Sequence, residues 1–183
     1  MNATSTIQLL TGDDLHTAVI EEQVLQAQRT VWIATADLKD MHVRSAGRAR
    51  RFRPLLEEFD EMAGRGVEFR IVHSALPSRP FRKTLESFER LTAGAMELQI
   101  CPRSHWKVVV VDGRFAYWGS ANFTGAGLGA RSASKRNLEI GSVSTDPATV
   151  AEVAALFDGF WVGDYCEGCR FREIPERCPD PIR

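Results

Sequence analysis

One stretch of the sequence gathers the side chains that phosphate chemistry needs. In CPRSHWKVVVVDGRFAYWGSANFT, residues 101–124, His105 and Lys107 precede a run of valines, and Ser120 and Asn122 follow the next apolar segment. Imidazole can act as a nucleophile or carry a proton, and an ammonium, a hydroxyl and an amide can donate hydrogen bonds to an anion. The stretch has no carboxylate cluster for Mg²⁺, so we expect catalysis without a cofactor.

A β-hairpin is expected to bring these side chains together. Alternate side chains of an extended strand share a face, so His105 and Lys107 point the same way. Asp112-Gly113 between apolar runs predicts a two-residue turn, which places His105 opposite Ser120 and Lys107 opposite Trp118. A bulge would shift this register. The plainer alternative is a capped hairpin with a few polar residues at its end.

The spacing His105-x-Lys107-x4-Asp112-x6-Gly119-Ser120-x-Asn122 resembles the signature motif of the phospholipase D superfamily, and every named position is present. The order of elements over residues 14–162 is also similar to one domain of that family. The resemblance implies that His105 attacks phosphorus and forms a phosphohistidine. It also implies that Lys107 and Asn122 bind the phosphate oxygens, with Ser120 assisting.

Three other residues have expected roles around this motif. Asp112 and Gly119 belong to the motif, and we expect Asp112 to be structural because the predicted register puts it in the turn. Members of the family carry a downstream acid that orients the histidine, and Glu139 is the candidate here. It would fix the imidazole tautomer and stabilise positive charge. The alternative for Glu139 is a carboxylate on the surface of a strand.

The chain carries one copy of the motif, whereas the family uses two histidines on opposite sides of the phosphorus. His16, His42 and His73 are not followed by lysine at the required spacing. A second copy of the chain is therefore expected to supply the other set, in a two-fold homodimer. This matches the single-motif branch of the family, which includes small endonucleases. A degenerate, non-catalytic module is the alternative, and the intact motif argues against it.

Strands alternate with helices along the rest of the sequence. Apolar segments at 30–38, 67–76, 96–100 and 137–144 predict strands, and 53–66, 79–91 and 147–162 predict helices. The expected fold is α/β, with a mixed, mostly parallel sheet between helices, as in a phospholipase D-like domain. We expect a catalytic domain over 1–162 and a cysteine-containing tail over 163–183.

Composition indicates a soluble globular protein of 183 residues, with 44% hydrophobic and 26% charged residues and a net charge of −1. That charge gives no global attraction to nucleic acid or to anionic membranes. No secretory signal and no run of about 18 apolar residues is visible, so we expect a cytoplasmic protein that does not enter membranes.

Two basic segments favour nucleic acid as the substrate, because arginine clusters suit a polyanionic backbone. A solvated charged face is the alternative for both segments. Phospholipid head groups could meet the same residues, so a phospholipase or phosphatidyl-transfer enzyme remains an alternative, as does an inactive nucleic-acid-binding module. The candidate substrate-binding residues are Arg44, Arg48, Arg50, Arg51 and Arg53 in the first segment, and Arg131, Lys135 and Arg136 in the second.

The tail holds Cys166 and Cys169 in a C-x2-C pair, with Cys178 close behind. With Cys101, these thiols could form a structural zinc site that orders the tail; an iron–sulfur cluster is a less favoured occupant. The alternative is three unrelated thiols on a flexible tail and a buried Cys101. The tail lies outside the stretch that resembles the family, so the resemblance says nothing about it.

Overall fold

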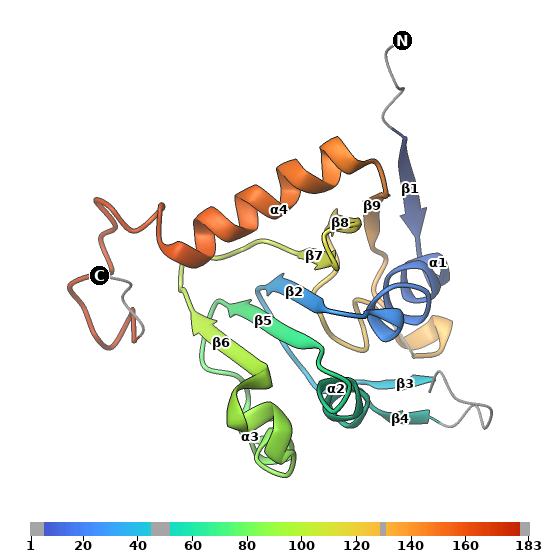
Figure 1. Ribbon diagram of the computed structural model, residues 1–183, viewed down its shortest axis with the longest axis horizontal. Coiled ribbons are helices and arrows are strands. Elements are labelled where there is room, and N and C mark those ends of the chain that lie inside the picture. The colour runs from blue at the N-terminus through green and yellow to red at the C-terminus, as the bar shows by residue number, and fades with distance from the viewer. Residues whose placement is uncertain (1–5, 45–51, 129–130, 180–183) are drawn as a thin grey trace.

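A computed structural model describes residues 6–44, 52–128 and 131–179 of the chain. Its centre is a seven-stranded sheet with the order β1-β9-β8-β7-β2-β5-β6 (Figure 1). A separate two-stranded ribbon consists of β3 (His42–Arg44) and β4 (Phe52–Pro54). The strands of the main sheet are β1 (Ile7–Thr11), β2 (Thr30–Thr35), β5 (Glu68–His73), β6 (Met96–Ile100), β7 (Val108–Val111), β8 (Phe115–Gly119) and β9 (Ile140–Ser144).

The α/β class and the mixed sheet are confirmed, but the expectation of a mostly parallel sheet is wrong. Only β2, β5 and β6 pair in parallel, and the other four pairings of the main sheet are antiparallel. Parallel neighbours need a long crossover connection, whereas β7 and β8 are joined by a short turn. Strands β8 and β9 also pair as antiparallel neighbours, and the described part of the loop between them contains the short 3₁₀ turn η4 (Ala133–Lys135).

Helices cover both faces of the sheet (Figure 1). A large core lies on the face covered by α1 and α2, where Phe59 stacks on Phe69 and Tyr117 is buried. A smaller cluster lies under α4, where buried Phe157 stacks on Trp32. The helical elements are α1 (Asp13–Leu15), η1 (His16–Glu21), η2 (Val24–Gln26), α2 (Leu55–Ala63), α3 (Arg79–Leu85), η3 (Leu91–Ala95) and α4 (Pro147–Val162).

Helix α4 begins and ends at the residues that its sequence indicates. The carboxylate of Asp146 accepts the Thr149 N–H at 2.9 Å, and Pro147 occupies the first turn. Gly163 ends the helix in the left-handed conformation, with φ 91°. Residues 164–179 follow as a series of turns. In the described ranges, no helix is long and apolar enough to cross a bilayer.

The hairpin that carries the motif has a three-residue turn, so the predicted register is wrong by one residue. Val111 pairs with Phe115 and Val108 with Trp118. Asp112 and Gly113 both have left-handed backbones, with φ 53° and 65°. The alternation of side chains is nevertheless as predicted: Val109 and Val111 enter the large core, while Trp106 and Val108 pack in the cluster under α4.

Candidate active site

His105 and Lys107 lie together just before β7. The Lys107 ammonium is 3.1 Å from His105 Nδ1 and 3.2 Å from Nε2, and it donates to the His105 carbonyl at 3.0 Å. His105 is exposed, whereas Lys107 is half-buried. Burial lowers the pKa of Lys107, and the negative charge of Glu139 acts in the opposite direction. The imidazole is thus open to a substrate, and a cation lies directly beside it.

Ser120 and Glu139 form a second group beside this pair. The Ser120 hydroxyl donates to Glu139 Oε2 and accepts the Ile140 N–H at 3.1 Å. Asn137 Nδ2 donates to Glu139 Oε1 at 3.0 Å. Both oxygens of the carboxylate are therefore held, and its charge acts on Lys107. Asn137 was not predicted from the sequence, although its position two residues before Glu139 could have indicated it.

Gly119 lies where the two parts of the site meet. Its N–H donates to the Lys107 carbonyl at 3.1 Å, so Lys107 is opposite Gly119 and not opposite Trp118 as predicted. A Cβ at Gly119 would lie 2.6 Å from the Ile140 carbonyl oxygen and 2.7 Å from the Tyr117 hydroxyl oxygen. Such distances do not occur in real contacts, so a side chain does not fit here without backbone movement.

The Tyr117 side chain that approaches Gly119 is itself buried, and burial raises the pKa of Tyr117 to about 12.

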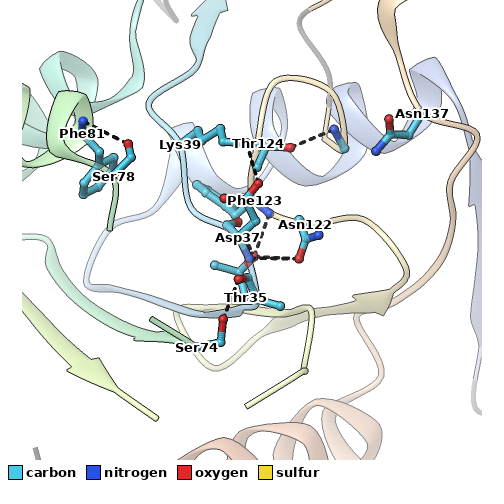
Figure 2. Close-up of polar contacts among 12 residues, drawn as sticks. Thr35, Asp37, Lys39, Ser74, Ser78, Phe81, Asn122, Phe123, Thr124 and Asn137 are labelled. Carbon is cyan, nitrogen blue, oxygen red and sulfur yellow. Dashed lines mark hydrogen bonds and ion pairs between the residues drawn. The ribbon is translucent and has the colours of Figure 1, made fainter. Parts of the chain in front are cut away.

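Asn122 is oriented by the loop that follows β2 (Figure 2). Its Oδ1 accepts the Asp37 N–H at 3.2 Å and the Thr35 hydroxyl at 3.5 Å. The Thr35 hydroxyl also accepts the Phe123 N–H at 2.9 Å. Because the oxygen of the amide is occupied, its NH₂ group is the end that can donate to an anion. Thr35 and Asp37 were not predicted, because β2 gave no polar motif.

Asp112 ties the hairpin turn to the start of β2. Its carboxylate accepts the N–H groups of Gln28, Arg29 and Thr30 at 2.9, 2.8 and 2.9 Å, and it is paired with Arg114 at 2.9 Å. Burial acts to raise the pKa of Asp112, but the backbone N–H groups and the Arg114 charge outweigh it, and the pKa is lowered. These contacts support the structural role expected for Asp112.

The predicted basic residues are in different situations. Arg53 lies against three carboxylates of α2, at 2.6 Å from Glu57, 3.2 Å from Glu58 and 2.5 Å from Glu61. Arg136 is paired with Asp13. Both arginines are thus paired with carboxylates of the same chain, and their expected role in substrate binding stays a prediction. Arg131 and Lys135 are exposed. Arg48, Arg50 and Arg51 lie outside the described residues, and Arg44 is described by its backbone alone.

Two cysteines of the tail, Cys166 and Cys169, lie near Arg103 in the connection between β6 and β7. The charge of Arg103 interacts with Cys169, Cys101 and Cys166, and its contact with Cys169 lowers the pKa of that thiol. Within residues 6–44, 52–128 and 131–179, no three His, Cys, Asp or Glu side chains are arranged to hold a metal ion. The zinc site of Cys101, Cys166, Cys169 and Cys178 therefore stays a prediction.

An apolar cavity of about 440 Å³ opens beside His105. Its walls come from the face of the sheet under α4, through Trp118, and from α4 itself, through Val153 and Leu156. Leu156 is 50% exposed. The cavity places an apolar surface within reach of a group bound at the imidazole.

Residues 20–161 match the family model described as "Cardiolipin synthase, PLD-like domain". The match spans more than half of the chain, which therefore belongs to the phospholipase D superfamily. No curated protein matches the chain at the sequence level.

Solved structures show the same fold at low sequence identity. NucT from Helicobacter pylori is 13% identical, with a TM-score of 0.59 over 85% of this chain and 94% of that one. Nuc from Salmonella typhimurium, a phospholipase D family member, is 14% identical, with a TM-score of 0.54 over 86% and 95%. A phosphatidylserine synthase from Haemophilus influenzae Rd KW20 is 17% identical, with a TM-score of 0.57 over 84% of this chain but 38% of the synthase.

Proposed function

We propose that the protein is a phosphodiesterase that cleaves nucleic acid through a covalent phosphohistidine on His105, as a homodimer and without a catalytic metal. The observation that carries this proposal is the arrangement of an open imidazole beside the Lys107 ammonium, with the Ser120–Glu139 pair adjoining. An imidazole nitrogen supplies the nucleophile, and fixed donors supply the stabilisation of the phosphoryl oxygens.

The reaction has two displacements at phosphorus. In the first, a His105 nitrogen forms a bond to phosphorus while the bond to the leaving oxygen breaks, and an acid on the opposite side protonates that oxygen. In the second, the group that has lost this proton takes one from water, whose oxygen attacks phosphorus and releases His105. Lys107 and the NH₂ group of Asn122 bind the oxygens that carry charge in both steps.

The second histidine comes from a second copy of the chain. One copy carries one motif, and an acid is needed on the far side of the phosphorus. Exposed apolar side chains adjoin the site: Leu138 is fully exposed and Ile140 is 55% exposed, on either side of Glu139. On the neighbouring strand β1, Leu9 is 69% exposed. Covering this apolar surface with a second copy would bury it and bring the two His105 side chains to one site.

Nucleic acid is the favoured substrate on size and charge. This chain covers 94% of NucT and 95% of Nuc but only 38% of the phosphatidylserine synthase, so it is similar in size to the first two proteins. The exposed Arg131 and Lys135 follow Asn122 in the loop to β9. Cations next to a phosphodiester site favour a polyanionic substrate.

Phosphatidyl transfer is the second candidate, and the apolar cavity beside His105 favours it. An acyl chain of a phospholipid could occupy that cavity while its phosphate lies at the imidazole.

Cleavage assays in excess EDTA separate the two candidates. We expect the wild-type protein to cut labelled DNA or RNA, and His105→Ala to bind without cutting. Metal content and folding should be measured in the same samples, because EDTA could also remove a structural metal. Hydrolysis of phospholipid vesicles, with both nucleic acids left intact, would favour the second candidate and exclude the first.

A further inference from the structure

A polar cavity of about 260 Å³ is lined in part by residues that closely follow Asn122 in the chain. One wall is the segment 39–42 after β2, and the other is the segment 124–126, which directly follows Asn122 and Phe123. The basic residues that line it are Lys39 and His42, both from the first wall, and Arg131 from the loop beyond the second. The two displacements described above use none of the three side chains.

Two backbone contacts fix this cavity to the site (Figure 2). The Lys39 N–H donates to the Phe123 carbonyl at 3.3 Å, and Leu38 and Phe123 form a parallel bridge. The same two segments meet again where the Asp37 N–H donates to Asn122 Oδ1 at 3.2 Å. The walls of the cavity therefore begin at the residues that hold the phosphate-binding amide, and its position relative to that amide is set by backbone bonds.

Two cationic side chains that could bind an anion line the cavity, Lys39 and Arg131. The Lys39 ammonium is 2.7 Å from the Asp37 carboxylate, and the two side chains are 60% and 43% exposed. Such a pair in water is weak enough for another anion to compete for the lysine. Burial raises the pKa of Asp40, the acid that lines the cavity, although Leu56 N–H and His42 act against this. The Arg131 guanidinium lies over Gly125, where a Cβ would be 3.5 Å from its Nε.

We propose that this cavity binds a backbone phosphate of the nucleic acid next to the phosphate that is cleaved. The inference rests on the proposed function and specifies its substrate as a strand with at least two consecutive phosphodiesters. Lys39 and Arg131 supply charge-assisted donors, and Arg131 can bind two phosphate oxygens at once. A substrate with only the reacting phosphodiester reaches His105 but leaves the cavity empty.

The test compares two substrates in EDTA: a short oligonucleotide and bis(p-nitrophenyl) phosphate. The quantity to compare is kcat/KM for the oligonucleotide divided by kcat/KM for the small diester. We expect Arg131→Ala and Lys39→Ala each to lower this ratio about tenfold. For the oligonucleotide, the slope of log kcat/KM against log salt concentration should become shallower by about 1 for each phosphate contact removed. Lys83→Ala, which removes an exposed cation from α3, is the matched control and should leave the ratio unchanged.

The possible failures are distinguishable. An unchanged ratio and salt slope in folded Arg131→Ala and Lys39→Ala, with both substrates still cleaved, would overturn the phosphate subsite and leave the proposed function standing. Equal losses on both substrates would also overturn it, because the residues would then act on the reacting centre. If the wild-type protein cleaves neither substrate, or only phospholipid vesicles, the proposed function fails and the subsite fails with it.

Discussion

The carboxylate of Glu139 is the charged group of the site with the most defined surroundings. Ser120 and Asn137 donate to its two oxygens, and its charge raises the pKa of Lys107 against the effect of burial. Its expected role as the partner of His105 stays a prediction. Its effect on Lys107 adds a second role, which is to keep the ammonium protonated at higher pH.

Replacing Glu139 by Gln tests this second role. The amide retains hydrogen-bonding capacity but loses the negative charge, so the pKa of Lys107 should fall further. We expect kcat/KM for an oligonucleotide to drop by at least about tenfold and its alkaline limb to move to lower pH. Glu152→Gln, on the exposed side of α4, is the control. A drop in rate with an unmoved alkaline limb would show that Glu139 does not act through Lys107.

Asp112 makes a prediction about stability and pH. The folded state lowers the pKa of its carboxyl, so the stabilisation is complete above the ordinary value of about 4 and is lost as the pH falls through the lower folded value. At pH 7 we expect Asp112→Ala to lower the free energy of unfolding by about 2–3 kcal/mol, because it removes the carboxylate that accepts three backbone N–H groups. Urea unfolding of both proteins at pH 7 and pH 3 checks this. A difference that does not shrink at pH 3 would contradict it.

At the scale of elements, the hairpin β7–β8 shows what sequence reasoning could and could not supply. The motif spacing singled out His105, Lys107 and Asn122 as candidates, and the alternation of an extended strand predicted that His105 and Lys107 point the same way. Asp-Gly is compatible with both two- and three-residue turns, so the sequence does not decide the register. The pairing of Val111 with Phe115 shows the three-residue turn. Thr35 and Asp37 could not be predicted, because only the fold brings β2 beside Asn122.

Gly119 gives a prediction for this hairpin. A methyl group there would lie 2.6 Å from a backbone oxygen of β9, so we expect Gly119→Ala to destabilise the protein by about 1–3 kcal/mol and to displace Lys107. Gly125→Ala is a suitable control for stability, since its Cβ would lie 3.5 Å or more from its neighbours. Thermal unfolding measures both variants. Equal stability of Gly119→Ala and the wild type would mean that the β8–β9 approach is looser than described.

At the scale of the whole molecule, the proposal requires two chains. We expect Leu9→Asp and Ile140→Asp to convert the dimer into a folded monomer and to reduce cleavage at least tenfold, because a charge on each apolar position opposes burial. The oligomeric state can be measured by light scattering coupled to size-exclusion chromatography, across a range of protein concentrations. Leu76→Asp, an exposed apolar residue between β5 and α3, is the control and should remain dimeric. A wild-type protein that cleaves as a monomer would contradict the need for a second motif.

The most direct test of the covalent mechanism is the mass of the His105 peptide after rapid alkaline quenching during turnover of an oligonucleotide in EDTA. Alkaline conditions are chosen because phosphohistidine is labile in acid. The proposed mechanism predicts that this peptide gains the mass of a nucleotidyl phosphate, and that the gain is absent in His105→Asn, which should not turn over substrate. A nucleotidyl adduct on another residue, or full turnover by His105→Asn, would contradict the mechanism.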